Sequence, residues 1–142
     1  MELLANGLEL RISSLTSLRA QGPRRVDIEV EIPGFCGGYT ACIQSSDFRR
    51  FAEELEQLEA GVDKKRTATL ATQQRDLCVE LTVDDSGAGQ GSYRFDISPE
   101  EGVFASVTGA FEFDGSVIPL LRHDAAELAG HHSSRVRGLT SA

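Results

Sequence analysis

The sequence has no tryptophan, one methionine and only two tyrosines among its 142 residues. Because stacking on bases or sugars needs aromatic side chains, this scarcity argues against a protein that binds single-stranded nucleic acid. No apolar run approaches the roughly 20 residues of a membrane-spanning helix, so we expect no membrane association. The chain has no apolar N-terminal signal and three cysteines, an odd number, which favours a reducing cytoplasm over a disulfide scaffold.

Basic residues are outnumbered by acidic ones. The chain has 14 lysines and arginines against 22 aspartates and glutamates, and its net charge is -8. A nucleic-acid binder needs a basic footprint for phosphates, so the charge argues against this class. A basic protein partner is favoured instead, although the same acidity would also keep any domain in solution.

Residues for catalysis or metal binding are few and badly spaced. The only histidines are His123, His131 and His132, near the C-terminus, where they are expected on or after the last helix. A serine or cysteine nucleophile would need one of them as its base, so we predict no catalytic residue. Cys36 and Cys42 are six residues apart, wider than zinc-ligand spacing, and we therefore predict no metal site and no cofactor.

Ser45 to Gly61 is the clearest element in the sequence. Its apolar residues recur at spacings of three and four and its charged residues fall on the other side, which predicts an amphipathic helix. Strand-like segments lie on both sides of it, over residues 8–15, 26–32, 39–43, 67–72, 77–83, 92–97 and 103–113. A last helix is expected over residues 116–129.

Most links between these segments have hairpin length, which favours an antiparallel sheet. The sequence therefore predicts an α+β fold, mainly an antiparallel sheet of about seven strands with one central helix packed on it and a C-terminal helix. We expect one domain over residues 1–130 and a mobile tail over residues 131–142. Residues 21–25 are predicted to be a loop, residues 84–91 a glycine-rich hairpin turn, and Gly109 a bulge or break.

Acidic side chains are the main candidates for a binding surface. Val26 to Ile32 alternates most cleanly, with apolar residues facing one side and three carboxylates facing the other. Such exposed positions lack the burial that a general acid and base pair needs, so they favour binding over catalysis. The candidate partner-binding residues are Asp27, Glu29, Glu31, Glu53, Glu56 and Glu80. The alternative is that these residues form only a solvated face.

The run GFCGGYTACIQSSDFRRFAEELEQLEAG contains a strand that enters a helix of the form DFxxFxxELxxL. Together with the later strands and the closing FEFDGSVIPLL, it resembles the WapI-like family of bacterial immunity proteins over roughly residues 26–121. The resemblance implies a small cytoplasmic protein, commonly encoded next to a polymorphic toxin, that protects the producing cell by binding the toxin domain. It brings no catalytic residues, and a basic toxin would complement the acidic faces.

Two alternatives to an immunity role follow from the residues. One is a small-molecule binding or carrier domain with an apolar pocket between sheet and helix, near Phe51, Tyr93 and Phe111. The other is a structural module whose exposed sheet pairs with a copy of itself as a homodimer. A neighbouring gene that encodes a secreted toxin would favour immunity, whereas a ligand bound in a closed pocket would favour the carrier.

Overall fold

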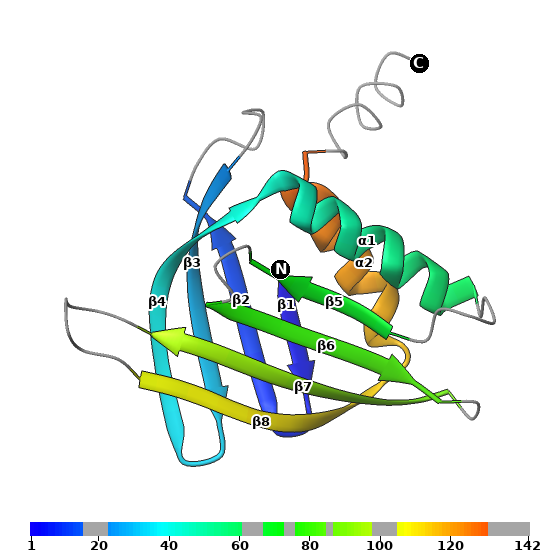
Figure 1. Ribbon diagram of the computed structural model, residues 1–142. Coiled ribbons are helices and arrows are strands. Elements are labelled where there is room, and N and C mark those ends of the chain that lie inside the picture. The colour runs from blue at the N-terminus through cyan, green and yellow to red at the C-terminus, as the bar shows by residue number, and fades with distance from the viewer. Residues whose placement is uncertain (16–22, 61–66, 73–75, 85–86, 98–104, 131–142) are drawn as a thin grey trace.

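The computed structural model describes residues 1–15, 23–60, 67–72, 76–84, 87–97 and 105–130, which contain eight strands and two helices (Figure 1). In chain order these are β1 (Glu2–Ala5), β2 (Leu8–Ser14), β3 (Pro23–Ile32), β4 (Phe35–Gln44), α1 (Ser45–Ala60), β5 (Thr67–Ala71), β6 (Leu77–Val83), β7 (Ala88–Ile97), β8 (Ala105–Asp114) and α2 (Val117–Leu128). The pairs between these strands are antiparallel. The predicted α+β class is confirmed. The division into a domain of residues 1–130 and a tail stays a prediction, since residues 131–142 lie outside the described part.

The strands form two sheets of four, ordered β1-β2-β3-β4 and β5-β6-β7-β8, so the expectation of one sheet of about seven strands is wrong. Within each sheet every strand pairs with its neighbour in sequence, as short links favour. Between β4 and β5 the chain instead passes through the 16 residues of α1, which span roughly 24 Å. The helix thus separates two groups of strands, and each group forms its own sheet.

The two sheets face each other, and in Figure 1 their strands cross at a steep angle. At one corner Asn6, just after β1, pairs with Glu112 of β8, with backbone N–H to O distances of 2.9 and 3.1 Å. α1 packs against α2 and against β5. The sheets are therefore joined at the β1 and β8 edges and covered by α1 at the β5 edge.

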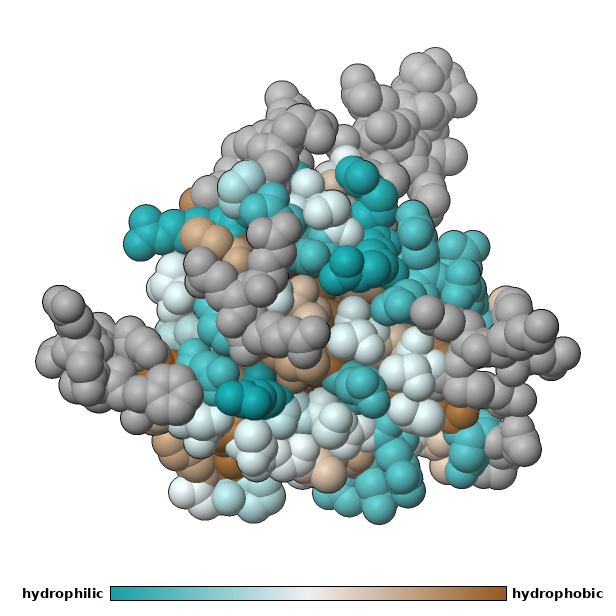
Figure 2. Space-filling model, viewed as in Figure 1, coloured by the Kyte–Doolittle hydropathy of each residue, from teal (hydrophilic) through white to brown (hydrophobic). Residues whose placement is uncertain are grey.

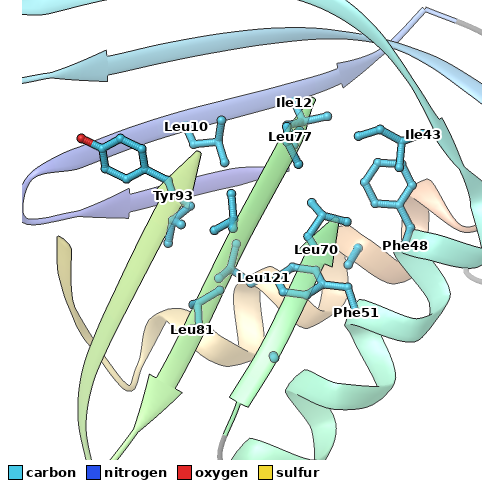
Figure 3. Packing of buried hydrophobic residues seen from close by; sticks show 14 of the residues in the cluster. Leu10, Ile12, Ile43, Phe48, Phe51, Leu70, Leu77, Leu81, Tyr93 and Leu121 are labelled. Carbon is cyan, nitrogen blue, oxygen red and sulfur yellow. The ribbon is translucent and has the colours of Figure 1, made fainter. Parts of the chain in front are cut away.

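The core fills the space between the sheets and continues under the helices (Figure 3). In that view Leu10, Ile12 and Ile43 of the first sheet lie across from Leu70, Leu77, Leu81 and Tyr93 of the second, with Phe48, Phe51 and Leu121 from the helices. Burial of apolar surface of this kind is the main force that stabilises the fold. On the outside, Figure 2 shows hydrophilic side chains over α1 and a mixture of hydrophilic, intermediate and hydrophobic ones over the visible face of the second sheet.

Two predictions about glycines are wrong. β7 begins at Ala88, so Gly89 and Gly91 are strand residues and not part of a turn, and β8 continues through Gly109 without a break. Each of these glycines pairs with an aromatic residue on the neighbouring strand, and their partners are Phe113, Phe111 and Tyr93 in that order. A Cβ atom at any of the three would come within 2.2 to 2.3 Å of the facing aromatic side chain, so these side chains occupy the space that a substituent would need.

β3 also begins earlier than expected, at Pro23. Arg24, predicted in a loop, is therefore a strand residue and is only 1% exposed. Its Nε donates a hydrogen bond of 3.1 Å to the carbonyl oxygen of Leu128, in the last turn of α2. A cation at this position also suits the negative end of the helix dipole.

The start of α1 agrees with its prediction, and Asp47 reaches back to the residue before the helix. Its Oδ2 accepts a hydrogen bond of 3.2 Å from the backbone N–H of Gln44, the residue before the helix, and its Oδ1 lies 3.1 Å from Nη2 of Arg50. A first-turn carboxylate that reaches back in this way satisfies an amide that the helix itself leaves without a partner. The predicted terminator Gly61 lies outside the described residues.

Candidate partner-binding surface

The alternation of β3 places its carboxylates on the outer face of the first sheet. Val26 and Ile28 point into the core and are 0% exposed, whereas Glu29 and Glu31 are exposed and Asp27 is half-buried. Successive strand residues point to opposite faces, so the buried side chains fix the direction of the acidic ones. The structure therefore brings the three predicted β3 residues together on one surface.

Pairing with β2 adds two residues that the sequence reasoning did not single out. Glu9 lies opposite Glu31, and Arg11 lies opposite Glu29. Arg11 also lies 3.9 Å from Glu2 on β1, measured from Nε to Oε2. The alternation of β2 indicates that Glu9 and Arg11 face outward, but only the register between the strands shows that they meet the β3 carboxylates.

These residues surround a shallow groove of about 400 Å³. Its lining consists of Glu9, Arg11, Asp27, Glu29, Val30, Glu31, Cys36, Gly37 and Gly38. Gly38 lies opposite Glu29 and carries no side chain, which leaves the space beside that carboxylate open. A Cβ atom at Gly38 would lie 2.9 Å from the carbonyl oxygen of Ile28, so the close approach of β3 and β4 favours glycine there.

The groove carries a surplus of negative charge. Its lining contains four carboxylates, on Glu9, Asp27, Glu29 and Glu31, and one guanidinium, on Arg11. Such a concave, acidic surface raises the local concentration of cationic groups and speeds the encounter with a basic partner. The chemistry that the arrangement best supports is therefore recognition of lysine or arginine side chains.

The other three candidate residues lie elsewhere. Glu53 and Glu56 are exposed on α1, and Glu80 is exposed on β6, at the outer face of the second sheet. Two other glutamates of α1, Glu54 and Glu59, make structural contacts. Glu54 accepts a hydrogen bond of 3.0 Å from the backbone N–H of Thr69, and Glu59 lies 3.0 Å from Nε of Arg122. The six candidates are thus divided between the first sheet, the helix and the second sheet.

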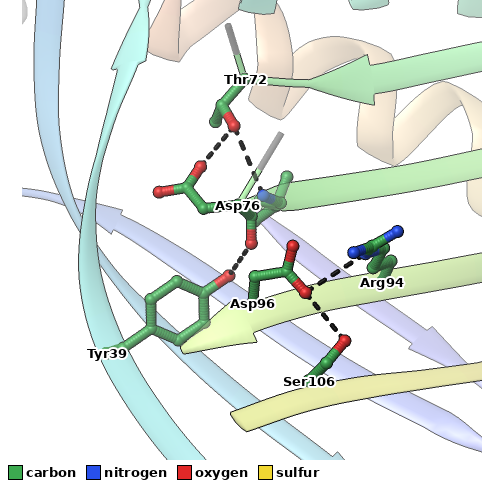
Figure 4. A network of polar contacts seen from close by, with 7 residues as sticks. Tyr39, Thr72, Asp76, Arg94, Asp96 and Ser106 are labelled. Carbon is green, nitrogen blue, oxygen red and sulfur yellow. Dashed lines mark hydrogen bonds and ion pairs between the residues drawn. The ribbon is translucent and has the colours of Figure 1, made fainter. Parts of the chain in front are cut away.

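A polar network connects β4 to the second sheet (Figure 4). The Tyr39 hydroxyl donates to the carbonyl oxygen of Asp76 at 3.1 Å, and the same oxygen accepts the backbone N–H of Asp96 at 2.8 Å. Burial, together with the negative charges of Asp76 and Asp96, raises the pKa of Tyr39 far above its usual value. The hydroxyl therefore stays protonated and keeps this link as a donor.

Asp96 is the second centre of this network. Ser106 Oγ donates to Asp96 Oδ1 at 2.8 Å, and Arg94 Nε lies 3.2 Å from the same oxygen. The hydrogen bond from Ser106, and then Arg94, lower the pKa of Asp96 against the opposing effect of burial. These contacts join β7 to β8, so we assign the network a structural role.

One group of possible metal ligands occurs among the described residues, formed by His123, Asp124 and Glu127 of α2 within 4.8 Å of one another. His123 is exposed, as expected, and its Nε2 lies 3.3 Å from Glu127 Oε1. Asp124 Oδ2 accepts the backbone N–H of Glu2 at 3.3 Å. The hydrogen bond to Glu2 and the contact between His123 and Glu127 account for these side chains without a metal.

Within the described residues, no helix is long and apolar enough to cross a membrane. The sequence matches the Immunity protein WapI-like family over residues 5–128, which includes β2 to β8, both helices and the acidic groove. No curated protein matches the chain.

Proposed function

Because the chain belongs to the WapI-like family of immunity proteins, we propose that it protects its producer by binding a cognate toxin directly. The partner is a protein with a basic surface, and the chain acts by binding and not by catalysis. Support for this comes from the family and from the surplus of negative charge on the chain, which is -8 overall.

The observation that carries the proposal is the acidic groove of the first sheet. There Asp27, Glu29 and Glu31 line one hollow with Glu9, in the arrangement that basic side chains recognise. Glu53, Glu56 and Glu80 are the alternative contact residues, on two other surfaces. The groove holds three of the six candidate residues, against two on α1 and one on β6, so we assign the toxin contact to it.

Cytoplasmic action fits the state of the cysteines. Cys36, Cys42 and Cys78 are all free thiols, and the first two are exposed. Exposed thiols persist in a reducing compartment and oxidise outside it. We therefore place the encounter with the toxin in the cytoplasm of the producing cell.

The carrier alternative is less well supported. Phe51, Tyr93 and Phe111, the residues named for an apolar pocket, are 1%, 7% and 4% exposed. The rings of Tyr93 and Phe111 stack with their centroids 6.3 Å apart. These side chains are part of the packed core, where they stabilise the fold.

The test compares the binding of two triple variants to the toxin domain that the family leads us to expect in the product of a neighbouring gene. The groove variant removes three charges from the groove and carries Asp27→Asn, Glu29→Gln and Glu31→Gln. The second variant removes three charges elsewhere and carries Glu53→Gln, Glu56→Gln and Glu80→Gln. Since both variants have a net charge of about -5, a difference between them reports position and not total charge. We expect the groove variant to lose at least about tenfold in affinity at low salt and the other to stay within about twofold.

Growth rescue on co-expression is read in parallel with affinity. If the wild-type chain neither binds the toxin nor rescues growth, the immunity proposal is wrong. If it binds and the second triple variant is the weaker one, immunity stands and the contact lies on the helix and the second sheet. High salt should reduce the difference between the wild type and the groove variant, because exposed charges are screened.

A further inference from the structure

The four edge strands of the two sheets differ in how they are covered. β1 and β8 meet each other through Asn6 and Glu112. β5 is covered by α1, where Glu54 binds the Thr69 N–H at 3.0 Å. No described strand pairs with the outer edge of β4. Within the described part of the chain, β4 thus has no strand along its outer edge, whereas β8 has the single bridge at Glu112.

The geometry of the β3–β4 hairpin shows which backbone groups face that open edge. Pro33 and Gly34 connect the strands as a two-residue turn, in which Gly34 has a φ of +84° and Ile32 pairs with Phe35. The residues that flank such a turn form a hydrogen-bonded pair, and pairs alternate from there along the strands. The backbone N–H and C=O groups of every second residue therefore point away from β3. These residues are Cys36, Gly38, Thr40 and Cys42. By the same alternation Pro23 and Gln44 form a pair without hydrogen bonds between them. A proline is accommodated there, because it has no N–H to donate to β4.

β4 has none of the usual features that prevent an edge strand from pairing. Its ten residues, FCGGYTACIQ, contain no charged residue and no proline. Natural sheets commonly protect their edges with such residues or with a covering element. The four residues that direct backbone groups outward are all exposed. The sequence of β4 thus keeps a long edge accessible.

We propose that an extended segment of the toxin, carrying basic side chains, adds to this sheet as a fifth strand along β4. This inference rests on the proposed immunity function and specifies how the partner binds. Backbone hydrogen bonds to β4 would supply affinity, and alternate side chains would supply specificity, as in other cases of strand addition.

The acidic groove explains why the segment is basic. Strands lie about 4.8 Å apart, so an added strand lies roughly 10 Å from β3. Gly38 has no side chain between the edge and Glu29, with which it pairs. A lysine or arginine on the added strand therefore reaches across β4 to the carboxylates of Glu29 and Glu31.

Charge also argues against a second copy of this chain as the occupant. If two β4 edges paired, the acidic faces of both copies would form one continuous surface. Each copy would bring the four carboxylates of its groove and one Arg11 guanidinium. Like charges placed side by side oppose association, whereas a basic segment is attracted.

The test uses two substitutions at Thr40. Thr40→Pro removes an N–H that faces the open edge and leaves the hydrogen bonds to β3 in place, because prolines are tolerated on edge strands. Thr40→Val changes the side chain and keeps the N–H. We expect Thr40→Pro to bind the toxin domain at least about tenfold more weakly than the wild type, and Thr40→Val to bind within about twofold. Circular dichroism and thermal melting check that both variants fold.

Hydrogen exchange of the wild-type complex gives a second, independent measurement. The amides of Gly38, Thr40 and Cys42 should exchange more slowly when the toxin domain is bound, whereas the exchange rate of the Glu80 amide should not change.

Two results would show that strand addition is wrong while immunity stands. In the first, the wild type binds and rescues but these amides stay unprotected. In the second, Thr40→Pro binds as well as Thr40→Val. If the free chain forms a dimer that Thr40→Pro converts to a monomer with unchanged toxin affinity, the edge pairs with a second copy instead. A wild-type chain that does not bind the toxin overturns both proposals.

Discussion

At the scale of single residues, three glycines support the second sheet by having no side chain. Gly89 and Gly91 of β7 pair with Phe113 and Phe111 of β8, and Gly109 of β8 pairs with Tyr93 of β7. Rings that fold over cross-strand glycines fill the gaps that glycine leaves in a strand. The aromatic side chains and the glycines therefore form one packing unit.

Gly89→Ala should destabilise the protein for this reason. The new Cβ would lie 2.3 Å from the Phe113 ring, which is buried and has little room to move. Overpacking of this kind costs about 1 to 3 kcal/mol. Urea unfolding measures the loss, and Gln90→Ala, at the exposed next residue, should change the free energy of unfolding by less than about 0.5 kcal/mol. Equal effects of the two substitutions would show that the ring accommodates a methyl group.

At the scale of elements, Arg24 attaches the end of α2 to the first sheet. α2 contains no basic residue in its last turn, and the cation comes from β3. Arg24 donates to Leu128 over a separation of 104 residues. The contact thus holds the C-terminal helix against a strand near the start of the chain.

Arg24→Met keeps much of the side-chain volume and removes the donor to Leu128. A buried carbonyl that loses its partner costs about 1 to 3 kcal/mol, and we expect a loss of that size in the free energy of unfolding. Arg25→Met is the matched control, because Arg25 is exposed on the same strand and should change stability by less than about 0.5 kcal/mol. A similar small effect at both positions would contradict the role assigned to Arg24.

The elements also show what the sequence can and cannot predict. The alternation of Val26 to Ile32 and the amphipathic pattern of α1 depend on nearby residues, and both predictions agree with the structure. The roles of Gly89 and Arg24 depend on Phe113 and Leu128, which are distant in sequence, so local patterns gave no sign of them. The candidate site divides in the same way. The three β3 carboxylates were predicted, whereas Glu9 and the hollow at Gly38 required the strand register.

At the scale of the whole molecule, the polar network of Figure 4 connects the second sheet to β4, which lies at the opposite edge of the first sheet from β1. Tyr39 binds Asp76 from β4, and Asp96 binds Asp76, Ser106 and Arg94 within the second sheet. The fold therefore has polar links between its sheets on both sides of the apolar core. The ionised carboxylate of this network, on Asp96, joins β7 to β8 within the second sheet.

Acid should weaken the contacts of Asp96 with Ser106 and Arg94. The pKa of Asp96 is lowered in the folded state, first by the Ser106 hydrogen bond, so its contribution to stability is present above the unfolded value of about 3.9. That contribution is lost as the pH falls through the lower folded-state pKa. Asp96→Asn should therefore be less stable than the wild type at about pH 7, and the difference should shrink at about pH 3. Urea unfolding at the two pH values measures this difference in stability.

Ser106→Ala should behave similarly, because it removes the largest cause of the lowered pKa of Asp96. A difference between the wild type and Asp96→Asn that is the same at both pH values would show that Asp96 does not link stability to pH.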